Sequence, residues 1–257
     1  MIKVSRIRIP ELPTRKARRL YVYLPRGYDR GSERYPVLYM FDGHNVFFDS
    51  HATYGKSWGM KQYLERTGRK LILVAVECNP EGFRRLNEYS PWDFRESHIG
   101  QMEGLGKVTM DWMTRELKPW VDETYRTLPD REHTWIAGSS MGGLMSLYAA
   151  VEYNAVFSRA AALSPSLWVS PRGMKELLRS CRLESPTAVY MDLGSAEVGE
   201  HLEAFRGMFR VAGLLSQKGA AVAARIVPGA EHCEAAWEKR IPVFFEYFDS
   251  VPSGEGF

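Results

Sequence analysis

The sequence has few cysteines, no long hydrophobic run and almost no excess of charge. Its three cysteines, Cys78, Cys181 and Cys233, are widely spaced and odd in number, which argues against a disulfide framework and fits a reducing compartment. No apolar run approaches the ~18 residues that a membrane span needs, and residues 1–6 lack the apolar core of a signal peptide. We therefore expect a soluble, cytoplasmic protein that does not enter a membrane.

The charge balance offers no electrostatic case for nucleic acid. The chain has 34 basic and 31 acidic residues, a net charge of +3, and no dense basic stripe. The densest basic cluster, residues 15–19, lies at a predicted strand start and is typical of a solvated turn. We expect no nucleic-acid partner and no membrane partner, and the sequence leaves the oligomeric state open.

The chain is long and apolar enough for one large domain. Its 257 residues are 45% hydrophobic, which fits a single α/β domain over residues 1–250 and a short tail over 251–257. Apolar runs alternate with amphipathic stretches, without an internal repeat or a linker, and this predicts a mainly parallel central sheet with helices on both faces. The predicted strands are residues 2–9, 19–24, 35–41, 70–76, 134–137, 160–163, 187–192 and 221–227, the first two pairing antiparallel.

Between these strands the pattern predicts helices and one long loop. Residues 77–106 contain repeated glycine and proline, which predicts an irregular loop of functional or mobile character. Residues 107–125 have helical apolar spacing despite Pro119 near their end. The other predicted helices are residues 59–66, 174–179, 202–217 and 235–248.

The chain's strongest signal is Gly138-x-Ser140-x-Gly142, which follows a predicted strand and opens a predicted helix. This is the pattern of a nucleophile elbow, in which a serine lies on a strained strand-to-helix turn. Residues without side chains are needed two positions away so that strand and helix can approach. Ser139 is the competing candidate, but only Ser140 is two residues from both glycines. The alternative without chemistry is a glycine-rich helix start.

A serine hydroxyl needs a base to take its proton and an acid to orient that base. In α/β-hydrolases these residues occur along the chain in the order serine, acid, histidine. The base must therefore follow Ser140, and the histidines that do so are His201 and His232. We favour His232, because it lies in a loop after the last strand. For the acid we favour Glu197 in the preceding loop over Asp192 at the strand end, with Glu200 as a distant third.

Two backbone amides are predicted to stabilise the oxyanion. The amide of Met141 starts the helix after Ser140, where the helix dipole is positive. The second amide should come from the turn after strand 35–41, where Gly43 permits a close approach, and our candidate is the amide of His44.

The stretch from Ala137 to Tyr148 resembles the elbow of the esterase D-like family of α/β-hydrolases. This family includes S-formylglutathione hydrolases, feruloyl and acetylxylan esterases, siderophore esterases and bacterial mycolyltransferases. Other stretches of this chain that resemble the family are residues 38–47, 87–92, 116–120 and His232 followed by Trp237. The resemblance implies an α/β-hydrolase fold and a nucleophile, acid and base at Ser140, Glu197 and His232. We expect no cofactor. The elbow and the turn at 42–45 are closer to the siderophore and carbohydrate esterase branch.

The leading hypothesis is a serine carboxylesterase that acts on a small-molecule ester through an acyl-enzyme. The same residues could serve an acyltransferase or a thioesterase, if an alcohol intercepted the acyl-enzyme or if the substrate were a thioester. A different class is a metal-dependent hydrolase with Asp42, His44, Asp49 and His51 as ligands, although a turn and a cap explain these residues as well. A third class is a binding protein without catalysis on a hydrolase scaffold.

Aromatic residues near the predicted site suggest an aromatic or sugar-bearing ester. The candidates for substrate contact are Phe47, Tyr89, Trp92 and Trp168, some of which could equally be core residues. Arg84 and Arg85 could meet an anionic group, but the sequence favours solvated loop charges.

Overall fold

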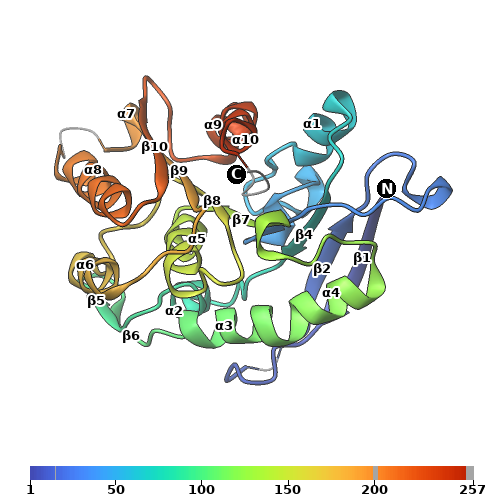
Figure 1. Cartoon of the computed structure of the whole chain (residues 1–257). Coiled ribbons are helices and arrows are strands. Elements are labelled where there is room, and N and C mark those ends of the chain that lie inside the picture. Colours follow the sequence, from blue (N-terminus) through green and yellow to red (C-terminus); the bar gives the residue numbers. More distant parts are fainter. Residues whose placement is uncertain (15, 199–201, 253–257) are drawn as a thin grey trace.

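The computed structural model describes residues 1–14, 16–198 and 202–252. Within these residues an eight-stranded sheet runs through the middle of the molecule (Figure 1). In spatial order its strands are β1 (Ile2–Ile7), β2 (Arg18–Tyr23), β4 (Ile72–Val76), β3 (Val37–Met40), β7 (Thr134–Ser139), β8 (Arg159–Leu163), β9 (Ala188–Gly194) and β10 (Ala221–Val227).

The sheet is mainly parallel, as predicted. β1 pairs antiparallel with β2, and β2 pairs antiparallel with β4. Every other neighbouring pair, from β4 through β10, is parallel. The carboxyl ends of β7, β8, β9 and β10 therefore lie along one edge of the sheet, where open α/β sheets place their sites.

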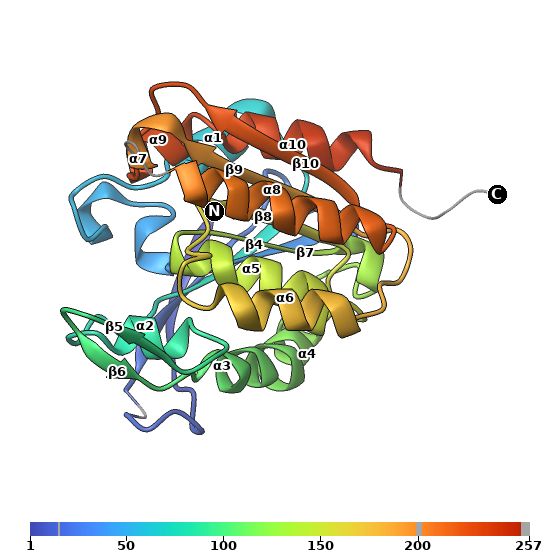
Figure 2. The same cartoon turned by 90° about the vertical axis from the view of Figure 1, so that its left-hand side faces the viewer.

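Helices cover both faces of the sheet because successive strand residues point to opposite sides. Val74 packs into one hydrophobic cluster, and its neighbours Leu73 and Ala75 pack into the other. The helices that contribute to the first cluster are α3 (Gly106–Trp112), α4 (Lys118–Thr124), α5 (Met141–Glu152), α6 (Pro171–Ser180) and α8 (Leu202–Gln217). Those that contribute to the second are α1 (Met60–Thr67), α9 (Glu234–Glu238) and α10 (Ile241–Ser250). Figure 2 shows α1, α9 and α10 above the strands and α3, α4 and α5 below them. None of the helices in the described ranges has the length and apolar character that crossing a membrane requires.

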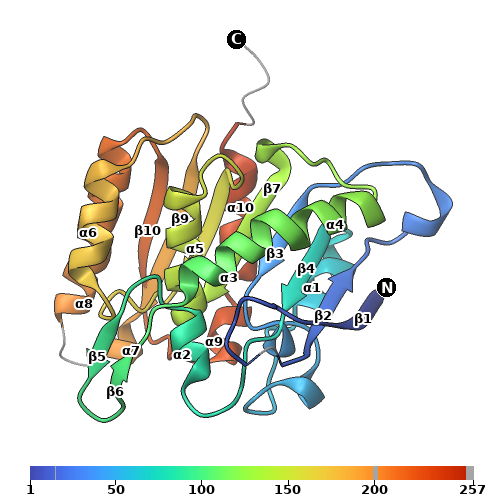
Figure 3. The ribbon, with the colours of Figure 1, turned by 90° about the horizontal axis from the view of Figure 1, so that it is seen from below.

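The stretch 77–106 is more structured than predicted. It contains α2 (Arg84–Glu88) and a small hairpin of β5 (Phe94–Glu96) and β6 (Gly100–Met102). Elements of three to five residues are too short to produce a readable hydrophobic period. Seen from below in Figure 3, the hairpin and α2 lie beside α6 and α3.

Two predicted helices are interrupted at proline residues. Residues 107–125 form α3 and α4 joined by a π-helical segment, Met113–Leu117. Pro119 has no N–H for the carbonyl four residues earlier and its ring would clash there, and a widened turn relieves this conflict. The predicted helix 235–248 is divided into α9 and α10, and Pro242 lies in the first turn of α10.

Gly138 tests how tightly β7 and α5 are packed. An added Cβ at Gly138 would lie 2.7 Å from the backbone carbonyl atoms of Gly142. We expect Gly138→Ala to lower the free energy of unfolding by about 1–3 kcal/mol, because strand and helix must separate. Chemical denaturation of the purified variant measures this loss.

Gly213 is the matched control, because an added Cβ there meets nothing within 4 Å on the exposed side of α8. Gly213→Ala should raise stability by about 0.5–1 kcal/mol through helix propensity. Equal effects of the two substitutions would contradict the close packing of the elbow.

Candidate active site

Ser140 is the turn between β7 and α5. Its backbone has φ 57° and ψ −121°, a conformation that a residue with a side chain adopts only under strain. The turn is tight on both sides: an added Cβ at Gly138 would strike Gly142, and one at Gly142 would lie 2.9 Å from Phe41 Cβ. The predicted pattern of glycines therefore corresponds to real backbone crowding around this serine.

The Ser140 hydroxyl lies next to a large cavity. Ser140 is half-buried, and its Oγ lies 3.4 Å from Ser166 Oγ, its hydrogen-bond partner within the described part of the chain. Ser166 lines a cavity of about 950 Å³ whose wall also contains Glu197 and His232. Two of the three residues favoured from the sequence, Glu197 and His232, thus lie in the cavity wall, and the third, Ser140, lies one hydrogen bond away from another residue of that wall.

His232 is held by Glu197. The Nδ1 atom of His232 lies 2.8 Å from Oε2 of Glu197. The Glu197 side chain is 4% exposed, whereas that of His232 is 45% exposed. A carboxylate at Nδ1 stabilises the tautomer that carries the proton there and leaves Nε2 as the acceptor.

The second carboxylate oxygen of Glu197 is fully engaged. Its Oε1 accepts hydrogen bonds from Ser164 Oγ at 2.6 Å, the Gly194 amide at 2.8 Å and Arg240 Nη2 at 3.1 Å. Burial alone would raise the pKa of Glu197. The hydrogen bonds from His232, Ser164 and the Gly194 amide outweigh burial, so its pKa is below the usual range. Glu197 is therefore held as a carboxylate.

Asp192, the other acid left open by the sequence, has different partners. It is completely buried and accepts hydrogen bonds from Tyr190 OH at 2.7 Å and Arg240 Nη1 at 2.8 Å. Burial raises the pKa of Asp192, and Arg240 and Tyr190 offset only part of that rise. The side chain of Asp192 is connected to Glu197 by Arg240, which forms a salt bridge with each carboxylate.

The loop of His232 must return across two strands to reach the elbow, because β8 and β9 lie between β7 and β10. The loop passes close to Gly194, which has no side chain to block it: an added Cβ there would collide with the carbonyl oxygen of Ala230. The same carbonyl accepts the amide of Ala196 at 3.1 Å. His232 also packs edge-on against Trp237, with ring centroids 5.0 Å apart.

Ser164 and Arg240 contact the candidate acid Glu197, and the sequence reasoning missed both. Ser164 has a positive φ of 47°, and its hydroxyl accepts from Trp237 Nε1 at 2.9 Å and Arg240 Nη1 at 3.1 Å while donating to Glu197. Its position at the end of a strand, before Pro165, was the available signal. No sequence signal pointed to Arg240, since an arginine in a helical stretch is ordinarily a solvated residue.

The two predicted oxyanion donors follow the carboxyl ends of two neighbouring parallel strands, β3 and β7. Met141 is the first residue of α5, and His44 lies in the short helix Gly43–Asn45 after β3. Gly43 lies against β4, since an added Cβ would be 2.7 Å from the Ala75 carbonyl atoms. The His44 imidazole bonds Thr53 Oγ1 at 3.0 Å through Nε2, so it is the backbone amide that remains the candidate.

Asp42 controls the start of this turn. It has a left-handed backbone, φ 54° and ψ 48°, and its carboxylate forms two 2.7 Å hydrogen bonds with Arg85 of α2. The hydroxyl of Tyr89 accepts the Asp42 amide at 3.1 Å. Arg85 is therefore not a solvated loop charge, as the sequence suggested, because the Asp42 carboxylate holds it over the turn.

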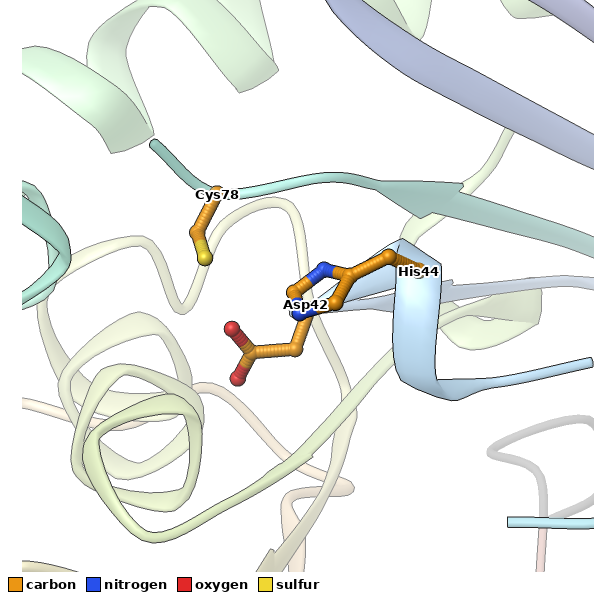
Figure 4. Close-up of side chains that lie close together, drawn as sticks. All are labelled: Asp42, His44 and Cys78. Atoms are coloured by element: carbon orange, nitrogen blue, oxygen red, sulfur yellow. The ribbon is translucent and has the colours of Figure 1, made fainter. Parts of the chain in front are cut away.

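The proposed metal ligands are not gathered into one site. Asp49 accepts from Ser57, and His51 Nδ1 lies 3.0 Å from Tyr21 OH. Among the described residues, Asp42, His44 and Cys78 do lie together, with their ligand atoms within 4.8 Å of one another (Figure 4). Both carboxylate oxygens of Asp42 already bond the Arg85 cation, so a metal ion there would face a guanidinium, and we assign no metal to this cluster.

The four aromatic candidates have different positions. Trp168 is 57% exposed and lines the cavity, and Trp92 is partly buried against Tyr148. Phe47 and Tyr89 were wrong as substrate contacts, because they are 1% and 2% exposed and lie in the two hydrophobic clusters. Of the weaker candidates for base and acid, His201 and Glu200 lie outside the described residues.

The sequence matches the family described as "Putative esterase" over residues 13–247. The chain belongs to this esterase family. It is an ester-hydrolysing enzyme with the α/β-hydrolase fold, and the expected resemblance is confirmed.

Individual proteins resemble the chain over most of its length, one in sequence and two in fold. The chain is 27% identical to a Bacillus subtilis protein named "Uncharacterized protein YbbA" over 196 residues, 75% of this chain and 74% of the relative. An IroE-like serine hydrolase from Shewanella oneidensis superimposes with a TM-score of 0.75 at 19% identity, covering 96% of this chain and 79% of that one. Siderophore hydrolase EstA from Aspergillus nidulans does so with a TM-score of 0.73 at 15% identity, covering 97% and 95%.

The lowered pKa of Glu197 predicts an acid-sensitive contribution to the esterase's stability. Because the folded-state pKa is below the unfolded value, the stabilisation is present above the unfolded pKa and is lost as the pH falls through the folded pKa. We expect Glu197→Gln to reduce stability near neutral pH and to flatten the loss of stability on acidification.

Denaturation curves at a series of pH values measure this effect. Glu176→Gln, which removes an exposed carboxylate paired with Arg172 on α6, is the control and should leave the pH profile unchanged. An unaltered acid limb in Glu197→Gln would show that the folded protein does not hold the pKa of Glu197 below its usual range.

Proposed function

We propose that this esterase is a serine carboxylesterase that forms an acyl-enzyme on Ser140. The observation that carries the proposal is the strained Ser140 beside a cavity whose wall also contains the hydrogen-bonded pair His232–Glu197. A nucleophile, a base and a group that orients the base are the parts that acyl transfer requires.

In the first step His232 Nε2 takes the proton of Ser140 as Oγ bonds to the ester carbonyl carbon. The carbonyl oxygen becomes an oxyanion, and the amides of Met141 and His44 donate hydrogen bonds to it. When the tetrahedral intermediate collapses, the bond to the alcohol oxygen breaks and His232 returns its proton to the leaving alcohol. Water then attacks the acyl-enzyme by the same sequence and releases the acid.

Glu197 supports this cycle electrostatically. It stays ionised while His232 becomes an imidazolium, and it keeps the ring oriented through Nδ1. Ser164 and Arg240 hold the other oxygen of Glu197, so the carboxylate has little freedom to rotate. Asp192 lies behind Arg240 and keeps that cation in place.

The unliganded site requires one adjustment before reaction. Ser140 Oγ hydrogen-bonds Ser166 rather than His232 within the described residues. Catalytic hydrogen bonds are often long in unliganded enzymes and shorten only when substrate is bound. The His232 side chain is 45% exposed and is held at Nδ1 by Glu197 and at its ring by Trp237, and the adjustment we propose is a movement of this ring toward Ser140.

Ser140→Ala tests the proposed nucleophile. We expect kcat/KM for p-nitrophenyl esters to fall by about 10⁴-fold or more, since the variant lacks the hydroxyl on which the acyl-enzyme forms. A fluorophosphonate should inactivate the wild-type enzyme stoichiometrically, and mass spectrometry should locate the adduct on Ser140.

Ser139→Ala is the matched control, because Ser139 is the adjacent serine on β7. It should keep most of the activity. Full ester turnover by Ser140→Ala, or labelling of another residue, would refute the mechanism.

Arg85 provides a second test, because its pair with Asp42 holds the turn that carries the His44 amide. We expect Arg85→Met to lower kcat by about 10-fold to 10²-fold, a partial form of the loss seen when an oxyanion donor is removed. Steady-state kinetics at saturating ester measures it.

Arg84→Met is the neighbouring control. Arg84 is exposed and lies 3.9 Å from Glu81, so its loss should leave kcat unchanged. If both variants behave alike, the turn after β3 is not held by Arg85.

A further inference from the structure

The cavity beside His232 continues as a groove along α8. The lining residues Glu203, Gly207, Val211 and Leu214 recur at helical spacing on one side of this helix. From Glu203 to Leu214 the helix rises by about 16 Å at 1.5 Å per residue. The opposite wall is the start of α6, with Pro171, Met174 and Lys175. Figure 2 shows α6 and α8 side by side.

The interior of the groove is apolar. Its lining includes Leu167, Met174, Leu193, Val211 and Leu214, of which Met174 is 1% exposed and Val211 8%. Gly207 contributes no side chain in the middle of this wall, and an added Cβ there would meet nothing within 4 Å. An extended hydrocarbon or aromatic chain can therefore lie along α8 with its ester at the catalytic end.

Some charged residues that line the groove have ion-pair partners and others do not. Both lining carboxylates have cationic partners: Glu197 bonds His232 and Arg240, and Glu203 bonds Arg206 at 2.6 Å. The lining Arg172 is likewise paired, with Glu176 at 2.7 Å. Lys175 and Arg210 also line the groove, and neither has a salt bridge or side-chain hydrogen bond within the described parts of the chain.

These two cations lie away from the catalytic end. Arg210 is seven residues beyond Glu203, which is about 10 Å along the helix at 1.5 Å per residue. Lys175 faces the same groove from α6. An apolar channel that begins at a reactive centre and reaches two unpaired cations is complementary to a chain that ends in an anion.

We infer that the groove between α6 and α8 selects esters whose acyl part is an extended apolar chain ending in an anionic group, which Lys175 and Arg210 bind. This inference rests on the proposed function, because it places the acyl carbonyl at Ser140. It adds a specificity site that the catalytic residues do not require.

The test compares three p-nitrophenyl esters of one acyl length: the monoester of suberic acid, its terminal carboxamide, and 8-aminooctanoate. Wild-type kcat/KM should be highest for the carboxylate and lowest for the ammonium ester. Added salt should reduce the advantage of the carboxylate. Lys175→Met with Arg210→Met should reduce kcat/KM for the carboxylate ester by about tenfold and leave the carboxamide ester unchanged.

The control double variant is Arg179→Met with Arg225→Met, which removes the same charge from exposed positions outside the groove. It should keep the wild-type order of the three esters. Lys175→Glu with Arg210→Glu should reverse the order, so that the ammonium ester becomes the best. A wild-type enzyme without preference, or equal effects of the two double-Met variants, would overturn the anion site.

The path of the chain is tested separately at Gly207. Gly207→Leu should fill the groove and lower kcat/KM for the suberyl ester by about tenfold or more while leaving p-nitrophenyl acetate unaffected. Gly213→Leu, on the same helix outside the groove, is the control and should affect neither ester. Equal turnover of the suberyl ester by both variants would show that the chain does not lie along α8.

Failure of the inference can be told from failure of the proposed function. Ser140-dependent hydrolysis of the carboxamide ester without any charge preference overturns only the anion site. Hydrolysis that persists in Ser140→Ala overturns the mechanism, and the inference falls with it.

Discussion

The close backbone contact between Gly138 and Gly142 is the constraint on which the rest of the site depends. It allows α5 to begin directly at the end of β7, with Ser140 held in a strained conformation at the turn. A side chain at Gly138 would push strand and helix apart, and one at Gly142 would push the helix away from Phe41. The energy for this strain comes from the buried parallel strands on both sides of β7, which leave the turn no other path.

A second layer of polar contacts supports the base. Arg240 bridges Asp192 and Glu197, and Ser164 bonds both Glu197 and Arg240. These groups are buried, so each hydrogen bond is stronger than it would be in water and each missing one more costly. The network turns a flexible glutamate after β9 into a fixed carboxylate that orients His232 from the loop after β10.

Much of this arrangement was predictable from local patterns. Continuous apolar runs indicated the central strands, and the glycines around Ser140 indicated the elbow. The order of residues along the chain pointed to His232 and Glu197. The short elements of residues 77–106 were missed because three to five residues carry no readable period. Phe47 and Tyr89 were misplaced because an aromatic residue looks the same in a sequence whether it lines a cavity or the core.

The sequence by itself determined the class of fold, the strained serine and the kind of chemistry, because these depend on neighbours within a few residues. Only the tertiary structure shows that His232 bonds Glu197 and not Asp192, because this depends on side chains 35 or more residues apart and on a buried arginine that bonds both carboxylates. It also decided that Arg85 holds Asp42 and that Lys175 and Arg210 share one groove. Such pairings join residues from separate helices and strands, and no local spacing encodes them.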